Sequence, residues 1–273
     1  MVEVLVHFVA PALVGVLIGI ASGLLGIGGG TVMVPIFRLA FGMSATMSTA
    51  TSLFAIIPTS ISGAISHAKG KTCIPALGIA AGLGGACMSP IGVWLAQLSP
   101  DWLVMLAAAL IIGYSAINMF KKAFKLRPAG QPAAGVDAAA STADDSSLSR
   151  KQLLQGAAIG LVAGLASGYV GVGGGFIMVP LMLSIIGIPM RKASGTSLIA
   201  VMILAIPGVI EQGIIGNINY LAGIAIVIGT IPGAVIGARL VTKVPERTLR
   251  LLFGCFLIVA AVMLVLNEVG IFG

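Results

Sequence analysis

The chain has 273 residues, of which 58% are hydrophobic and only 8% are charged, and its mean hydropathy is +1.14. A soluble globular domain carries about a quarter charged residues, so this composition excludes an ordinary soluble protein. It predicts an all-α polytopic membrane protein with the lipid bilayer around it. The net charge of +7 is explained by Lys and Arg in short loops, as in the cytoplasmic loops of membrane proteins, and we expect no nucleic-acid partner.

The N-terminal stretch MVEVLVHFVAPALVGVLIGIASG has no Lys or Arg before its apolar run. A secretory signal peptide carries positive charge there, so we interpret this stretch as the first membrane helix. The cysteines Cys73, Cys87 and Cys255 lie in or beside apolar runs and form no CxxC pair. This pattern predicts packing residues rather than a metal site or a disulfide.

Five apolar segments are expected in each half of the chain. In order, they cover residues 8–27, 30–42, 44–66, 74–97 and 101–120, and then 153–172, 175–187, 190–212, 218–241 and 247–267. A membrane-spanning helix needs about 20 residues at 1.5 Å each, so the second segment of each half is too short to cross alone. These two segments are either tilted half-helices met by a bent partner or parts of re-entrant hairpins.

A polar stretch separates the two halves. Residues 125–152 are rich in Ala, Ser, Pro and Gly and contain no apolar run, which predicts a flexible aqueous linker. The predicted organisation is therefore a first transmembrane repeat (1–124), a linker (125–152) and a second transmembrane repeat (153–273).

The second half repeats the plan of the first. With an offset of 145 residues, IGGGTVMVP (27–35) overlays on VGGGFIMVP (172–180), and TSL (51–53) overlays on TSL (196–198). The matched residues are chiefly Gly, Pro, Thr and Ser, which shared apolar content does not explain. An internal duplication is therefore predicted.

The basic residues predict how the two halves are oriented. In the first half they follow the third and fifth segments, whereas in the second half they precede the first segment and follow the second and fourth. This exchange fits five crossings per half with opposite orientations, the linker in the cytoplasm and both termini outside, with Arg38 as the exception. The alternative, four spans and a re-entrant loop per half with both halves oriented alike, leaves one basic cluster on the wrong side.

The glycine triplets open a short helix in each half. In inverted-repeat transporters, the N-termini of broken helices meet near the middle of the bilayer and present backbone N–H groups to an anion. Glycine lets a ligand approach the backbone closely, and hydroxyls early in the third segments can donate to the same anion. The predicted substrate-binding residues are Gly28, Gly29, Gly30, Ser48, Thr49, Thr51, Ser52, Gly173, Gly174, Gly175, Ser194, Thr196 and Ser197.

The competing interpretation is that small residues only allow helices to pack closely. A single glycine would favour packing, but two equivalent triplets, each followed by MVP and later by TSL, favour a substrate-lining role. Pro35 and Pro180 each lie five residues beyond a triplet and are predicted to kink the short helix.

Ionisable residues inside membrane spans are functional candidates, and this chain has few. Glu211 lies near the outer end of its segment and His67 near the inner end of the equivalent one. Both are candidates for coupling transport to protons, and an interfacial position at the end of a helix is the competing interpretation. Arg239 can hold an anionic substrate or snorkel to the cytoplasmic interface.

The duplicated GxGGGxxMVP motif, followed by TSL, resembles the TauE/SafE-type sulfite exporter family of prokaryotic membrane permeases. The resemblance covers nearly the whole chain outside the linker. It implies a secondary transporter of the prokaryotic inner membrane that carries sulfite, sulfonates such as sulfoacetate, or related organic anions. From this resemblance we assign only two segments to the substrate pathway, Gly28–Gly30 and Gly173–Gly175.

We therefore expect the substrate to bind near mid-membrane between the repeats and to move by alternating access. An anion channel, or a permease for another small organic acid, is the alternative. No GxSxG, HExxH or GxxxxGK[ST] motif is present, so we expect no hydrolase, no ATP-driven pump, and neither a cofactor nor a metal. Coupling to a proton or sodium gradient is left open, and a homodimer is compatible with the sequence.

Overall fold

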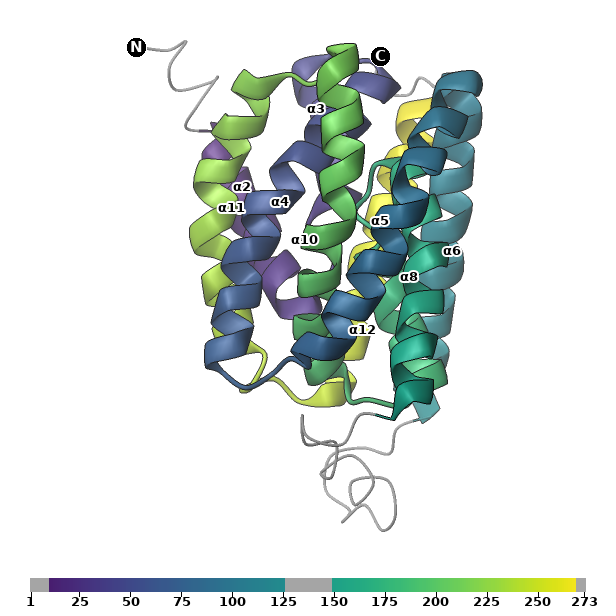
Figure 1. Ribbon diagram of the computed structural model, residues 1–273. Coiled ribbons are helices and arrows are strands. Elements are labelled where there is room, and N and C mark those ends of the chain that lie inside the picture. Colours follow the sequence, from purple (N-terminus) through teal and green to yellow (C-terminus); the bar gives the residue numbers. More distant parts are fainter. Residues whose placement is uncertain (1–9, 126–148, 269–273) are drawn as a thin grey trace.

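The chain forms a bundle of helices in a computed structural model, which describes residues 10–125 and 149–268 (Figure 1). The first half contains α2 (Ala10–Leu25), α3 (Gly30–Phe41), α4 (Ala45–Lys69), α5 (Pro75–Leu98) and α6 (Asp101–Lys125). The second half contains α8 (Arg150–Val170), α9 (Gly175–Leu181), the π-helix η2 (Met182–Ile186), α10 (Met190–Ile215), α11 (Tyr220–Leu240) and α12 (Glu246–Glu268). These two ranges contain no strand, so the predicted all-α class is confirmed.

The helices agree with the expected segments to within a few residues. One difference lies at α8, which begins at Arg150, inside the stretch assigned to the linker. Ser149 caps this helix, because its Oγ accepts from Lys151 N while the Gln152 side chain accepts from Ser149 N. Most of the predicted linker lies outside the described residues.

The two halves enter the bundle from opposite ends. In Figure 1, α2 begins and α12 ends at the upper end, here called the termini end, whereas α6 ends and α8 begins at the lower end, here called the linker end. The linker end holds nearly all the described Lys and Arg residues, namely Lys69, Lys71, Lys121, Lys122, Lys125, Arg150, Lys151, Arg191, Lys192, Arg239, Lys243, Arg247 and Arg250. Arg38 is the one described exception. The inverted topology of the halves in a membrane stays a prediction.

Seven helices are long and apolar enough to cross a membrane, namely α4, α5, α6, α8, α10, α11 and α12. The predicted short second segments are indeed short: α3 has 12 residues and α9 has 7. Each of them contains the expected proline, Pro35 in α3 and Pro180 in α9, and η2 follows α9 directly. A π-turn of this kind is a usual cause of a bend in a helix.

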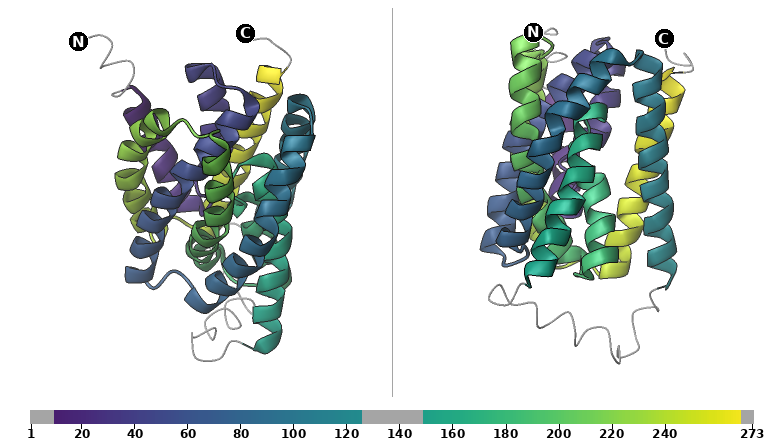
Figure 2. Two further views of the ribbon diagram at one scale, coloured as in Figure 1. Left: turned by 45° about the horizontal axis from the view of Figure 1, so that its top comes forward. Right: turned by 45° about the vertical axis from the view of Figure 1, so that its right-hand side comes forward.

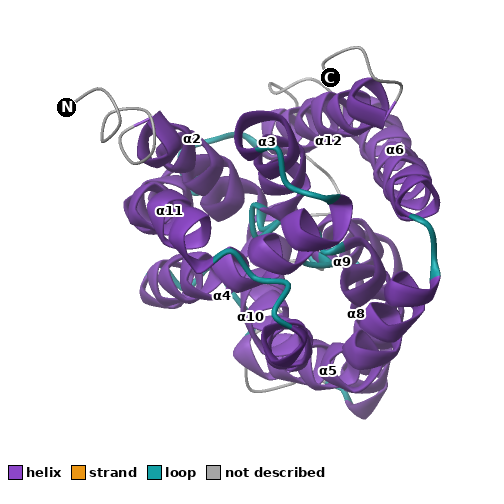
Figure 3. Ribbon diagram, turned by 90° about the horizontal axis from the view of Figure 1, so that it is seen from above, coloured by secondary structure: helices purple, strands orange, loops and turns teal. Residues whose placement is uncertain are grey.

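Helices from the two halves pack against each other in equivalent pairs. α2 packs along α11 just as α8 packs along α5, and α6 packs along α12. Figure 2 shows these long contacts from two sides, and Figure 3 shows the three pairs arranged around the centre of the bundle. The equivalent helices α4 and α10 contact each other between these pairs. The core of the protein is therefore an interface between its two halves.

Rows of glycine bring the backbones of these pairs into direct contact. A Cβ at Gly160 of α8 would lie 1.9 Å from Ala81 O of α5, and a Cβ at Gly229 of α11 would lie 1.8 Å from Ala12 O of α2. Residues four positions apart lie on the same face of a helix. The glycines that share a face with Gly160 in α8, or with Gly229 in α11, therefore form a small-residue contact surface. For these glycines, outside the triplets, the close-packing interpretation holds.

Replacing Gly160 with Ala is expected to destabilise the protein by about 1–3 kcal/mol, because the new methyl would push α8 away from α5. The matched control is Gly113 in α6, where a Cβ would meet nothing within 4 Å. There, alanine is expected to stabilise the helix by about 0.5–1 kcal/mol. Thermal unfolding in detergent compares the two variants, and equal melting temperatures would contradict the packing described above.

Candidate functional site

Each half has a glycine loop between its first two helices. The first glycine loop covers residues 26–29 and the second covers residues 171–174. Positive φ angles occur at the equivalent glycines of both loops, at 75°, 82° and 84° for Gly26, Gly28 and Gly29, and at 72°, 86° and 68° for Gly171, Gly173 and Gly174. A residue with a Cβ pays about 1–2 kcal/mol in this region. Backbone conformation therefore selects glycine here, in contrast to the packing rows.

The two loops meet inside the bundle. A Cβ at Gly30 would lie 2.5 Å from Val172 O, and a Cβ at Gly175 would lie 2.8 Å from Ile27 O. The start of α3 thus touches the second glycine loop, and the start of α9 touches the first. The structure brings the two predicted triplets together at the contact between the halves.

Backbone N–H groups at these loops are left available. Gly28, Gly29, Gly173 and Gly174 are buried, and no backbone carbonyl in the described ranges accepts a hydrogen bond from their N–H groups. Buried N–H groups are almost always paired in proteins. Neighbouring N–H groups in loops of this kind form concave sites for anions. The loops can therefore donate hydrogen bonds to a small anionic ligand.

One serine from each half adds a hydroxyl beside the glycine loop of its own half. Ser22 and Ser167 are equivalent under the offset, are fully buried, and have Oγ atoms without a hydrogen-bond partner among the described residues. The Cβ of Ser22 lies 3.7 Å from the Cβ position at Gly29, and that of Ser167 lies 3.3 Å from the one at Gly174. Buried polar groups without a partner call for an explanation. An oxyanion bound at a glycine loop would supply the missing partner of the serine beside that loop.

The serines of the two TSL motifs fasten the opposite loops. Ser52 Oγ donates to Gly171 O at 2.9 Å, and Ser197 Oγ donates to Gly26 O at 2.7 Å. Each bond joins a long central helix of one half to the glycine loop of the other half. A hydroxyl has only one proton to donate, and for Ser197 the carbonyl oxygen of Ser194, at 2.8 Å, is a second acceptor beside Gly26 O. In this conformation the two serines hold the loops in place, and a role in binding substrate stays a prediction.

The threonines of the same motifs also join the halves. Thr51 Oγ1 accepts from Asn219 N at 3.0 Å, and Thr196 Oγ1 accepts from Ile74 N at 2.9 Å. Asn219 and Ile74 are the residues that precede α11 and α5. The threonines thus fix where these helices begin against the opposite half.

The other predicted hydroxyls differ in their surroundings. Thr49 and Ser194 donate to carbonyls one turn earlier in their own helices, at 2.8 Å and 3.0 Å. Ser48 is buried and its Oγ has no partner in the described part of the chain, and the same holds for Ser60. The Ser60 Oγ lies 3.5 Å from the Cβ position at Gly28. Ser60 is therefore a further hydroxyl beside the first glycine loop that sequence reasoning missed.

Replacing Ser197 with Ala is expected to destabilise the protein by about 1–3 kcal/mol, because Gly26 O is then left buried without its partner. Thermal unfolding of the purified protein measures the loss. Ser52→Ala removes the equivalent bond and should give a similar loss. Unchanged melting temperatures for both variants would show that these bonds do not hold the halves together.

Two apolar side chains fill the space between the loops. Ile56 on α4 and Val201 on α10 are equivalent and fully buried. Cδ1 of Ile56 lies 2.6 Å from the Cβ position at Gly30 and 2.7 Å from the one at Gly173, so it contacts both loops. A ligand that passed between the loops would have to displace this side chain.

His67 and Glu211 lie at opposite ends of the bundle. His67 is fully buried at the linker end of α4, where Nε2 donates to Gly23 O at 2.7 Å and Nδ1 pairs with Thr72 Oγ1 at 2.7 Å. Glu211 is half-buried towards the termini end of α10, and its Oε2 has no partner among the described residues. Neither residue lies at the glycine loops, and their part in proton coupling stays a prediction.

Comparisons with known proteins agree with this architecture. The family model described as "Sulfite exporter TauE/SafE" matches residues 11–264. The chain is 28% identical to "Probable membrane transporter protein YunE" of Bacillus subtilis, covering 97% of this chain and 99% of that protein. It is 29% identical to a "Probable membrane transporter protein" of Haemophilus influenzae, covering 93% of this chain and 97% of that protein. No solved structure matches the chain.

Proposed function

The chain belongs to the sulfite exporter TauE/SafE family, and we propose that it is a secondary transporter of small sulfur-containing anions such as sulfite and sulfoacetate. The family and the names of the relatives indicate a multi-pass membrane transporter rather than an enzyme. The substrate class and the mechanism proposed below rest on the geometry of the glycine loops.

One observation carries the proposal: hydrogen-bond donors that have no partner among the described residues lie at two glycine loops, one from each half, that touch each other. These donors are the N–H groups of Gly28, Gly29, Gly173 and Gly174, with the hydroxyls of Ser22 and Ser167 beside them. Sulfite and sulfonate oxygens accept hydrogen bonds from both kinds of donor, and bonds to a charged acceptor are the stronger ones.

The charge of the surroundings also favours an anion. The described Asp and Glu residues are Asp101, Glu211, Glu246 and Glu268, and each occupies a backbone position near an end of a long helix, away from the glycine loops. A cation bound between the loops would therefore lack the carboxylate oxygens that hard cations prefer. Donors without nearby negative charge suit a small oxyanion.

The way the loops are held supports alternating access as the proposed mechanism. Each glycine loop is bonded to the central helix of the opposite half, through Ser52 or Ser197. Tilting one half against the other would strain these two bonds, and passage of the anion between the loops would require the Ile56 side chain to move out of their contact. The anion would then be released to one end of the bundle or the other, as in other transporters built from repeats.

Uptake into proteoliposomes tests the proposed function. The purified protein is reconstituted and offered labelled sulfite, sulfoacetate, taurine-derived sulfonates and small carboxylates in turn. Saturable uptake of at least one sulfur anion, with accelerated exchange when unlabelled anion is inside, is the expected result. The absence of uptake for the whole panel would overturn the proposal. Single-channel currents without counter-flow would favour an anion channel, which is the alternative function.

The orientation that we propose places the linker end in the cytoplasm and both termini outside, in a prokaryotic inner membrane. It is supported by the concentration of Lys and Arg residues at the linker end, since cytoplasmic loops are enriched in these residues. A proton or sodium gradient, or the gradient of the anion itself, would supply the driving force, with no resident cofactor. The only partners proposed are the bilayer, the anion and a second copy of the chain.

A further inference from the structure

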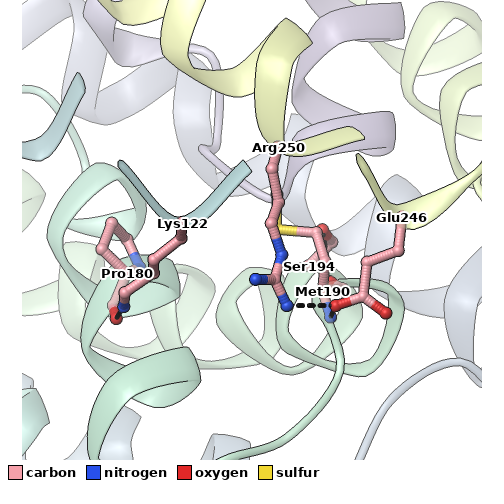
Figure 4. Close-up of polar contacts among 6 residues, drawn as sticks. All are labelled: Lys122, Pro180, Met190, Ser194, Glu246 and Arg250. Carbon is pink, nitrogen blue, oxygen red and sulfur yellow. Dashed lines mark hydrogen bonds and ion pairs between the residues drawn. The ribbon is translucent and has the colours of Figure 1, made fainter. Parts of the chain in front are cut away.

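Basic side chains from three helices turn into the protein at the linker end. They are Lys122 on α6, Arg250 on α12 and Arg191 on α10. Figure 4 shows Lys122 and Arg250 reaching in the same direction from their two helices, towards α9 and the start of α10. The Arg250 side chain is only 14% exposed.

Lys122 is bound to the short helix of the second glycine loop. Its Nζ donates to Pro180 O at 2.9 Å and also contacts Ser184 Oγ. Pro180 lies five residues after Gly175, where α9 begins. Pro180 is six residues beyond Gly174, the N-cap of α9, so at 1.5 Å per residue it lies about 9 Å along the axis from the nearer N–H group that we assign to the anion. The basic cluster and the glycine loop thus lie at the two ends of one short helix.

The positive charge of this cluster exceeds the negative charge beside it. Glu246 is the one described acidic residue at the linker end, and its Oε1 accepts from Met190 N at 3.2 Å and from Arg250 Nη2. Arg191 Nη2 donates to Val244 O at 3.0 Å. The Nε atoms of Arg191 and Arg250 are buried and have no partner in the described ranges. Glu246 therefore pairs with Arg250 alone among the three cations, and two guanidinium Nε donors have no partner in the described part of the chain.

A basic residue that serves only to orient a helix in the membrane can extend freely into water. Lys121 fits that description, because it is exposed. Its neighbour Lys122 does not, because it is half-buried and bonded to the Pro180 carbonyl. Partly buried charges are costly unless a counter-charge joins them. The excess charge at this cluster is what a small anion would neutralise.

We propose that Lys122, Arg191 and Arg250 form an anion-binding vestibule at the linker end, which holds the transported oxyanion before it reaches the second glycine loop. This inference rests on the proposed function. The vestibule belongs to one end only, since Met105 and Thr46 stand at the positions equivalent to Arg250 and Arg191. The same chemistry could bind the phosphate of a lipid headgroup, and the experiment separates the two sources.

The experiment measures sulfite transport in phosphatidylcholine vesicles in which the orientation of the protein has been determined. Sulfite is supplied either at the linker end or at the termini end. For Lys122→Gln, the KM at the linker end should rise about 10-fold, because a bond to a charged group is lost. The KM at the termini end should change less than about twofold, because the central site is intact. Lys121→Gln, which removes the same charge one residue earlier, should match the wild type at both ends.

Two further variants separate charge from folding. Lys122→Arg keeps the charge and should restore most of the KM at the linker end. Arg250→Gln removes the second charge without touching the contact between Lys122 and α9, and it should also raise the KM at the linker end. If Lys122→Gln and Arg250→Gln both behave like Lys121→Gln, the vestibule is overturned. If the wild-type protein transports no anion of the panel, the proposed function itself fails.

The lipid source is tested by adding phosphatidylglycerol to the same vesicles. If a lipid phosphate occupied the cluster, phosphatidylglycerol would stabilise the wild-type protein against heat but would not stabilise Lys122→Gln. The KM for sulfite would then be the same for the wild type and for Lys122→Gln. That outcome would overturn the vestibule for the transported anion. A KM difference that persists without anionic lipid supports it.

Discussion

Replacing Gly29 with Ala is expected to lower anion uptake about 100-fold or more, while the protein still folds and inserts. The new methyl would stand next to Ser22 and beside the N–H groups that have no partner in the described ranges. It would shift the bound anion, and a misplacement of about 1 Å can lower the rate about 100-fold. Folding should survive, because the nearest atoms are side-chain methyls, Cγ2 of Ile18 and Cε of the flexible Met33, each 3.0 Å away, and no backbone atom is among them. Uptake into proteoliposomes and the elution volume of the purified protein measure the two effects.

A control is needed because alanine at a positive φ also strains the backbone, by about 1–2 kcal/mol. Gly42 has a φ of 61°, and a Cβ there would meet nothing within 4 Å. It lies at the far end of α3 from the glycine loop, so Gly42→Ala should carry a similar strain and transport normally. If Gly29→Ala and Gly42→Ala transport equally well, the glycine triplet has only a structural role. In the second half, Gly187→Ala is the strain control for Gly174→Ala, whose Cβ would also lie 3.0 Å from the backbone oxygen of Ala163 and is expected to cost more stability than Gly29→Ala.

Replacing Ser22 and Ser167 with Ala is expected to weaken anion binding without destabilising the protein. Each hydroxyl is buried and has no partner among the described residues, so its removal costs no hydrogen bond within the protein. A bond to a charged ligand contributes about 1.5–3 kcal/mol. Each single variant should therefore raise the KM for the anion about 10-fold to 100-fold, and its melting temperature should be unchanged or higher.

The contrast with Ser52 and Ser197 makes this prediction specific. All four serines are buried, but Ser52 and Ser197 donate to carbonyls of the opposite loops. Alanine at those two positions should lower stability, whereas alanine at Ser22 or Ser167 should lower affinity. The assignment of the two pairs would be wrong if Ser22→Ala lowered the melting temperature and left the KM unchanged.

The helices and the meeting of the two triplets could be predicted because the chain repeats itself. Gly29 and Gly174, which are equivalent under the 145-residue offset, both have positive φ angles. Ser52 and Ser197, equivalent under the same offset, make equivalent hydrogen bonds. Local patterns were sufficient for helix ends, since most of them coincide with Gly, Pro or a capping residue. The sequence alone did not decide between crossing and re-entrant short segments, because that depends on how the halves pack.

The roles of individual hydroxyls could not be predicted in the same way. Ser52 and Ser22 are both small polar residues in apolar helices, and only the position of a carbonyl on the opposite half separates them. The repeated ASG stretch that contains Ser22 and Ser167 was visible in the sequence. The basic cluster was missed for a related reason. Lys122 resembles its neighbour Lys121 until the packing of α6 against α9 is known.

The most direct test of the central claim is the response of the glycine amides to a bound anion. The protein contains 38 glycines, and selective 15N labelling with assignment by substitution resolves the four of interest. On titration with sulfite, the N–H signals of Gly28, Gly29, Gly173 and Gly174 should move downfield and saturate together, whereas Gly113 in α6 should not move. Saturable transport of sulfite without any shift at these four amides would contradict an anion site between the glycine loops.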